Sequence, residues 1–100
     1  MKQNRYVSSS MFYVSSCMSK ILFIEDEASL QKTVGEILEQ ENFQVLRALN
    51  GEVGISLAKS EKPDLILLDL ILPKKDGFQV IQELRADPAT ANLKIIVLTN

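Results

Sequence analysis

A short apolar run that ends in one carboxylate constrains this chain more than any other feature of its sequence. Residues 65–68 are Leu-Ile-Leu-Leu, Asp69 follows them, and Pro63 and Pro73 bracket the segment. Apolar runs of this length are typical of a strand that is buried on both faces, as in a parallel sheet. Asp69 then lies where the strand leaves the core. Because an ionised carboxylate is costly to desolvate, this position predicts a compensating cation or hydrogen-bond donors.

The rest of the chain alternates between strand and helix patterns. In chain order, the patterns predict elements at about residues 21–24, 29–41, 43–48, 53–60, 65–68, 78–85 and 93–98, beginning with a strand. Such alternation favours βαβ units and a parallel sheet covered by helices on both faces. We expect Ser29 to cap the first helix, and we expect this helix to bury one apolar face made of Leu30, Val34, Ile37 and Leu38.

Composition indicates a single globular domain with few chemical options. Of the 100 residues, 46% are hydrophobic and 24% are charged. Thirteen acids and nine bases follow residue 17, a balance of −4, which argues against direct nucleic-acid contact by this segment. The chain has no His and one Cys, Cys17, so neither a zinc cluster nor an internal disulfide is expected. A reduced, cytoplasmic setting follows, and no apolar run has the roughly 18–20 residues of a membrane span.

Residues 1–17 differ from the rest because they are serine-rich and contain no acid. The segment 14–17, Val-Ser-Ser-Cys, loosely matches a lipoprotein cleavage site, but the serines at 8–10 interrupt the apolar region that an export signal needs. We therefore expect a flexible extension, or translation from a start upstream of Met18. The domain is expected to occupy residues 18–100.

Polar residues follow three of the predicted strands at their carboxyl ends. Glu25 and Asp26 follow the first strand, Asp69 the third, and Thr99 the fourth. In open parallel sheets ligands bind at this edge, and if the first and third strands are neighbours the three acids converge. Like charges so close raise one another's pKa unless a cation lies between them, and Mg²⁺ prefers such oxygen ligands. The set suits phosphoryl transfer, with Asp69 as nucleophile and Thr99 bonding a phosphoryl oxygen.

Each of these residues taken alone also has an ordinary structural explanation. Asp69 suits a strand-end cap, Asp26 a helix N-terminus, and Thr99 a strand interior. That oxygen-bearing side chains follow three strands at the same edge of the sheet favours a phosphoryl-transfer site over these separate explanations. Glu27 is expected to face solvent or the helix start, and Lys74 and Lys75 to form a solvated loop.

The same residues resemble the receiver domain of two-component response regulators, over residues 18–100. The family pattern has an acidic pair after the first strand, an aspartate after the third, a proline and a glycine four and eight residues later, and Thr or Ser after the fourth strand. The matching residues are Glu25, Asp26, Asp69, Pro73, Gly77 and Thr99. The resemblance implies a flavodoxin-like, three-layer α/β/α fold with a parallel sheet of order 2-1-3-4 in this chain.

The resemblance also implies roles and partners. Asp69 would accept a phosphoryl group from a sensor histidine kinase or a phosphotransfer protein, which makes the chain a signalling domain and not an enzyme. Mg²⁺ would be bound by Asp26, by Glu25 through water, by Asp69 and by the backbone carbonyl of Ile71, and Thr99 would sense the phosphate.

Two features depart from the family pattern. Asn100 stands where the family usually has Ala or Gly, and the fifth strand, with its phosphate-pairing Lys, is absent from the sequence. A C-terminally truncated domain is therefore expected, with an apolar fourth-strand edge through which copies could self-associate. A receiver-like interaction module that is not phosphorylated remains an alternative. A nucleotide binder is disfavoured because residues 25–27 would repel phosphate.

Overall fold

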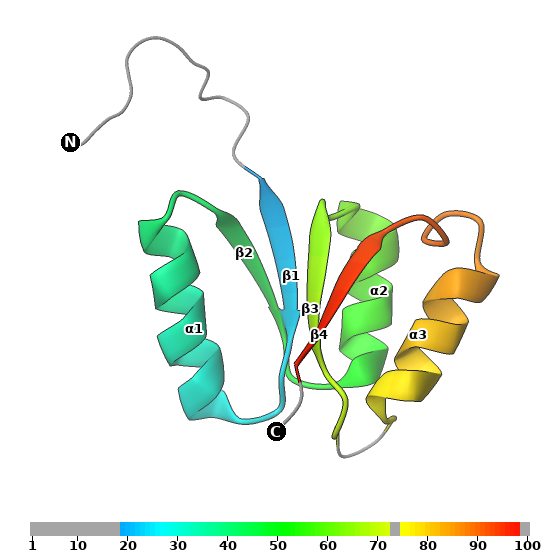
Figure 1. The fold of residues 1–100 in the computed structure, drawn as a ribbon, viewed down its shortest axis with the longest axis horizontal. Helices are drawn as coiled ribbons and strands as arrows, with labels where there is room; N and C mark the ends of the chain where they lie inside the picture. The colour runs from blue at the N-terminus through cyan, green and yellow to red at the C-terminus, as the bar shows by residue number, and fades with distance from the viewer. Residues whose placement is uncertain (1–18, 73–74, 99–100) are drawn as a thin grey trace, which may run out of the picture.

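The structure, a computed structural model, describes residues 19–72 and 75–98 and contains every secondary-structure element expected from the sequence (Figure 1). The elements are β1 Lys20–Ile24, α1 Ala28–Gln40, β2 Gln44–Ala48, α2 Gly51–Glu61, β3 Leu65–Asp69, α3 Gly77–Ala86 and β4 Lys94–Leu98. Residues 1–17, for which an extension was expected, lie outside the described residues.

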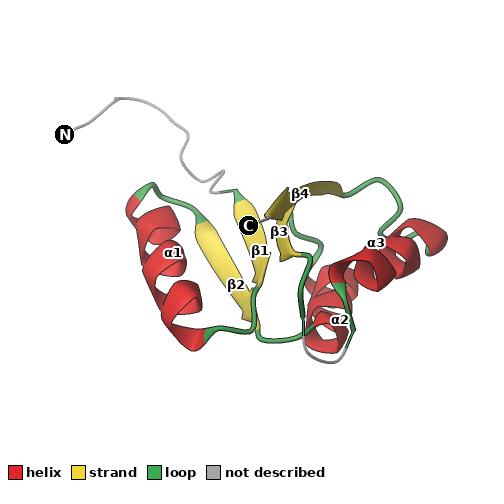
Figure 2. Cartoon of the chain, turned by 60° about the horizontal axis from the view of Figure 1, so that its bottom comes forward, coloured by secondary structure: helices red, strands yellow, loops and turns green. Residues whose placement is uncertain are grey.

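The strands form one parallel sheet in the order β2-β1-β3-β4. Helix α1 lies on one face of this sheet, and α2 and α3 lie together on the other (Figures 1 and 2). The predicted three-layer α/β/α fold and its strand order are thus confirmed. The described helices do not combine the length and the apolar character that crossing a membrane requires.

The main core lies between the sheet and the α2/α3 layer. Side chains alternate between the two faces of a strand, so every second strand residue points into this core. Leu22, Ile24, Ile66 and Leu68 are 0% exposed there. Helices α2 and α3 complete it with Ile55, Ala58, Val80 and Leu84. Burial of these strands on both faces explains their nearly uninterrupted apolar sequences.

The start of α1 differs from the prediction. The residue that precedes the helix is Glu27, and its side chain makes no capping hydrogen bond. Ser29, the expected cap, lies within the first turn, where its hydroxyl donates to Glu27 Oε2 at 3.0 Å. A residue inside the helical turn no longer has the extended backbone that capping requires, so the Ser29 prediction is wrong. Glu27 lies exposed at the helix start, as expected.

The buried face of α1 matches the predicted one only in part, because Val34 and Leu38 are half-buried. Leu30 and Ile37 are 43% and 54% exposed, whereas Gln31 and Gly35 are buried. A Cβ atom at Gly35 would lie 2.3 Å from Nη2 of Arg47, so Gly35 lies against the guanidinium group of this β2 residue. Apolar periodicity does not report this contact.

Candidate functional site

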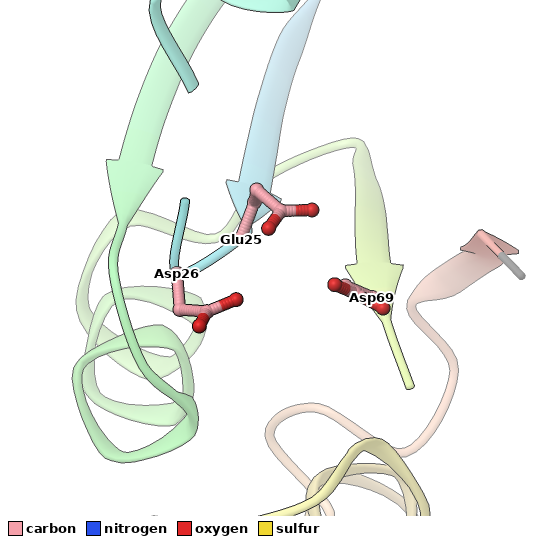
Figure 3. A group of neighbouring side chains, drawn as sticks. All are labelled: Glu25, Asp26 and Asp69. Atoms are coloured by element: carbon pink, nitrogen blue, oxygen red, sulfur yellow. The ribbon is translucent and has the colours of Figure 1, made fainter. Parts of the chain in front are cut away.

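Three carboxylates converge at the carboxyl edge of the sheet (Figure 3). Glu25 and Asp26 follow β1 directly, and Asp69 is the last residue of β3. Because β1 and β3 are parallel neighbours, their ends meet at the same place. One carboxylate oxygen from each of the three residues lies within 4.8 Å of the others. The predicted convergence of these acids is confirmed, and we call Glu25, Asp26 and Asp69 the acidic cluster.

Glu25 is the buried member of the acidic cluster, with 5% of its surface exposed. Its Oε2 accepts a hydrogen bond from the Glu27 N–H at 3.0 Å. Burial raises the pKa of Glu25 above its ordinary value of 4.5, and the neighbouring Asp69 charge raises it further, against the lowering effect of the Glu27 N–H. The charged form of Glu25 is therefore disfavoured, and a nearby cation would stabilise it.

A hard divalent cation fits this donor set. The cluster opens into a cleft of about 510 Å³ that Glu27, Leu30, Ile71 and Leu98 also line. None of the ion pairs formed by the described residues includes a member of the cluster. Lys75, which was expected to be solvated, pairs with Glu83 on α3. Carboxylates at this spacing offer the oxygen ligands that Mg²⁺ prefers.

The loop after β3 orients Asp69. The Ile71 N–H donates to Asp69 Oδ1 at 3.1 Å, and the Ile71 side chain is 73% exposed at the mouth of the cleft. The role expected for the Ile71 carbonyl stays a prediction. Thr99, Asn100, Pro73 and Lys74 lie outside the described residues, so the predicted phosphate-sensing hydroxyl of Thr99 also stays a prediction.

Gly77, the first residue of α3, packs directly against Leu70, the residue that follows β3. Its N–H donates to the Leu70 carbonyl at 2.7 Å, and a Cβ atom here would lie 2.5 Å from Leu70 Cα and 3.0 Å from the Asp69 carbonyl oxygen. The φ angle of Gly77 is not positive, so close packing and not backbone freedom requires glycine. Asp76 caps the same helix through a reciprocal capping box with Gln79. Gly77 thus does more than form the turn that the sequence suggested.

Gln31 is a positioning residue that the sequence reasoning missed. It is 3% exposed, and its Nε2 lies 2.9 Å from the Phe23 carbonyl, 3.2 Å from that of Glu25 and 2.9 Å from that of Ala48. One amide therefore ties the backbone of the acidic loop to the ends of β1 and β2. In the sequence, only the spacing of Gln31, Gly35 and Leu38 at i, i+4 and i+7 indicates that Gln31 shares the buried face of α1. Because glutamine is polar, its hydropathy gives no reason to predict burial.

Substituting Gln31 by leucine is expected to lower the free energy of unfolding by about 1 kcal/mol, because the Phe23 and Ala48 carbonyls lose the Gln31 amide as a donor while Ala48 keeps the Glu25 N–H. Chemical denaturation measures the change. Gln40→Leu, at the exposed end of the same helix, serves as the matched control and should change stability little. Equal changes in the free energy of unfolding would contradict a stabilising role for the Gln31 hydrogen bonds to the ends of β1 and β2.

Replacing Glu25 by glutamine is expected to stabilise the metal-free protein at pH 7. The folded-state pKa of Glu25 is raised, so its contribution to stability is present below pH 4.5 and is lost as pH rises through the raised value. Glutamine does not ionise, so the variant does not lose this stability at neutral pH. Its higher free energy of unfolding relative to the wild type should disappear below pH 4.5. Chemical denaturation at several pH values in a chelating buffer measures the difference in stability between the variant and the wild type. Glu36→Gln, at an exposed position on α1, is the control. A constant difference across pH would refute the assignment.

The fold and the site together define a class of protein: a flavodoxin-like α/β domain with an acidic cluster at the carboxyl ends of β1 and β3. Comparison with known proteins then identifies the family. Residues 21–100 match the family model of the response regulator receiver domain, and the chain belongs to this family.

Relatives and solved structures agree with the family assignment. The chain is 44% identical over 82 residues to the DNA-binding dual master transcriptional regulator RpaA of Synechocystis, covering 82% of this chain and 34% of that protein. It is 37% identical over 82 residues to protein PilH of Pseudomonas aeruginosa, covering 82% and 68%. It therefore spans about a third of RpaA and about two thirds of PilH.

One solved structure bears on the acidic cluster. The receiver domain of sensor histidine kinase PA1611 from Pseudomonas aeruginosa superposes with a TM-score of 0.79 at 29% identity, covering 83% of this chain and 68% of that one. That structure has a magnesium ion coordinated in its active-site cleft. The chain is thus a receiver domain of the two-component response regulator family, a signalling domain.

Proposed function

We propose that Asp69 is the phosphoacceptor of this receiver domain and that it takes a phosphoryl group from a phosphohistidine on a sensor histidine kinase or a phosphotransfer protein. The observation that carries the proposal is the position of Asp69, at the end of β3 and within 4.8 Å of the Glu25 and Asp26 carboxylate oxygens. No other group of described acidic residues is gathered in this way.

We infer the individual metal ligands from the resemblance to receiver domains: Asp26 and Asp69 would bind Mg²⁺ directly, Glu25 through water, and Ile71 through its backbone carbonyl. The gathering of the three carboxylates within 4.8 Å supports this set. The metal in the PA1611 receiver supports this assignment by likeness. When bound, the ion supplies positive charge that neutralises the oxygens of the transferring phosphoryl group.

Asp69 provides the nucleophile. One carboxylate oxygen attacks phosphorus, the P–N bond of the phosphohistidine breaks, and its electron pair stays on the imidazole nitrogen, which leaves an acyl phosphate on Asp69. The Ile71 N–H, bonded to Asp69 Oδ1, holds the carboxylate in place for this attack. The Thr99 hydroxyl would bond a phosphoryl oxygen and carry the signal to the output surface.

The proposal describes a phosphorylated switch and not an enzyme with a separate substrate. The acidic balance of residues 18–100 favours partners other than nucleic acid for this segment. The cytoplasmic setting and the absence of membrane contact expected from the sequence stay predictions. The self-association through β4 expected from the sequence stays a prediction as well.

Phosphoryl uptake by the purified chain tests the function. Incubation with a small phosphodonor and Mg²⁺ is expected to add one phosphoryl group, and peptide mapping by mass spectrometry should place it on Asp69. Uptake should fail when a chelator removes Mg²⁺. A folded chain that binds Mg²⁺ and takes up no phosphoryl group would support the alternative, an interaction module that is not phosphorylated, to which Asn100 points.

A further inference from the structure

The turn between β2 and α2 contains the dipeptide Asn50–Gly51, at the same edge of the sheet as the acidic cluster (Figure 1). Asn50 is half-buried and caps α2: its Oδ1 accepts the Val53 N–H at 2.9 Å, and its backbone carbonyl accepts the Gly54 N–H at 3.0 Å. Asparagine is among the preferred residues at such a cap. The cap therefore explains why asparagine stands at position 50.

Close packing explains the glycine that follows. Gly51 is buried, and a Cβ atom there would lie 2.7 Å from Val80 Cγ2 and 3.1 Å from the Lys75 carbonyl oxygen. The φ angle of Gly51 is not positive, so these contacts and not the backbone conformation exclude a side chain. Asparagine is a chemically labile residue, and a glycine after it leaves the next backbone nitrogen unobstructed. The packing of the turn thus keeps a reactive dipeptide in the chain.

The reaction open to this dipeptide is cyclisation followed by hydrolysis. The Gly51 nitrogen gives its proton to solvent and attacks Cγ of Asn50. The bond from Cγ to the amide nitrogen breaks, and this nitrogen takes a proton from solvent and leaves as ammonia, which produces a cyclic imide. Water then opens the imide at either of its carbonyl carbons. The product is aspartate at position 50 or isoaspartate, in which the main chain runs through Cγ.

The cap of α2 opposes this cyclisation. Ring closure requires the Asn50 carboxamide to rotate toward the Gly51 nitrogen, but the Val53 N–H holds its oxygen against the first turn of the helix. The Asn50 backbone is extended, with ψ at 170°, and the Gly54 N–H holds its carbonyl. Both bonds must break before the ring can close. Opening of one helical turn costs less free energy than global unfolding, so the reaction proceeds through this local opening.

We propose that Asn50 is a site of spontaneous deamidation, that the α2 cap slows the reaction, and that the isoaspartate product displaces the turn from its contacts with α3 and the loop before it. Aspartate keeps an oxygen for the Val53 N–H, and its charge suits a helix N-terminus. Isoaspartate adds one carbon to the main chain before Gly51, so the packing of Gly51 against Val80 and Lys75 cannot persist unchanged.

The displaced contact lies close along the chain to the acidic cluster. Lys75 directly precedes Asp76, the cap of α3, in the loop that follows Asp69. A shift of Gly51 against the Lys75 carbonyl therefore acts on the segment that leads from Asp69 to α3. The expected effect on phosphoryl uptake rests on the proposed function; the modification itself does not.

Incubation of the full chain at mildly alkaline pH, in buffer and in urea, tests the modification. Peptide mapping by mass spectrometry detects conversion of the amide to the acid, and an isoaspartyl methyltransferase with a labelled methyl donor measures isoaspartate. Asn50 should convert roughly tenfold more slowly in the folded chain than in urea, because the cap must open first.

Two exposed asparagines are internal controls for the glycine requirement. Asn42 and Asn92 precede Phe43 and Leu93, whose side chains obstruct the attacking nitrogen. Both controls should stay unmodified in urea over the period in which Asn50 converts. An unmodified Asn50 in urea, or equal rates in the folded and unfolded chain, would overturn the proposal.

Val53→Pro tests the role of the cap. Proline removes the N–H that Asn50 Oδ1 accepts and is tolerated in the first turn of a helix. Conversion of Asn50 in the folded variant should be about fivefold faster than in the wild type, since one cap hydrogen bond no longer opposes opening. Val53→Ala keeps the N–H and should show the wild-type rate. Equal rates in the two variants would contradict control by the cap, and the comparison in urea decides the proposal by itself if the proline variant does not fold.

The isoaspartate form, separated chromatographically from the aged chain, tests the consequence. It should unfold at a lower denaturant concentration than Asn50→Asp, which carries the same charge on an unaltered main chain and should match the wild type. Phosphoryl uptake should be roughly tenfold slower in the isoaspartate form and unchanged in Asn50→Asp. Equal denaturation midpoints would overturn the displacement of the turn. A wild-type chain that deamidates as expected but takes up no phosphoryl group would instead overturn the proposed function and leave the modification standing.

Discussion

Replacing Asp69 by asparagine is expected to reduce phosphoryl uptake to background while the fold persists. Asparagine keeps the size of the side chain and the oxygen that accepts the Ile71 N–H, but its amide is not a carboxylate nucleophile. The substitution also removes one member of the acidic cluster and with it one of the ligands that we propose for Mg²⁺. Intact-protein mass spectrometry after incubation with a phosphodonor measures the uptake.

Mg²⁺ binding gives this variant a second readout. At a free concentration about 100 times its Kd, the ion should raise the free energy of unfolding of the wild-type chain by about 2.7 kcal/mol, and this gain should shrink in Asp69→Asn. Without Mg²⁺ the variant should be the more stable chain at neutral pH, because the Asp69 charge that helps to raise the pKa of Glu25 is gone.

Asp64→Asn is the matched control for Asp69→Asn. Asp64 precedes the amino end of β3, where its Oδ2 accepts the Lys20 N–H at 2.7 Å, and an asparagine oxygen can keep this bond. We expect normal phosphoryl uptake and unchanged Mg²⁺ stabilisation. Loss of uptake in the control, or retained uptake in Asp69→Asn, would contradict the assignment of Asp69.

Gly77→Ala is expected to damage both the fold and the site. The new methyl carbon would lie 2.5 Å from Leu70 Cα, a backbone atom, so either α3 or the chain after Asp69 must move. Overpacking of this kind costs about 1–3 kcal/mol, and a displacement of about 1 Å at a reacting group can lower a rate about 100-fold. Denaturation curves and the initial rate of phosphoryl uptake measure the two effects.

Gly35→Ala provides the contrast for Gly77→Ala. A Cβ atom there would meet the guanidinium group of Arg47, the far end of a flexible side chain that can swing away. Alanine also favours a helix over glycine by about 1 kcal/mol, so the net change in stability should be small or positive. If the two substitutions destabilise equally, close packing against Leu70 is not what requires glycine at position 77.

Helix rotation and polar burial were the parts of the fold that the sequence predicted poorly. The pattern placed Leu30 and Ile37 on the buried face of α1, yet both are exposed, and Gln31 is buried in their place. Apolar spacing reports the preference of each side chain, but the face that a helix buries also depends on the groups that it meets. Here Gln31 meets the backbone carbonyls of Phe23, Glu25 and Ala48, which apolar spacing does not report.

The sequence by itself determined the order of strands and helices and the positions of the acids at the strand ends, because strand and helix periods and chain-breaking residues act locally. Only the tertiary structure decided that Glu25, Asp26 and Asp69 lie within 4.8 Å of one another, that Glu25 is buried, and that Gly77 packs on the exit of β3. These relations join residues up to 44 positions apart, and they exist only once β1 and β3 pair. Asp69 gains its acidic neighbours from that pairing.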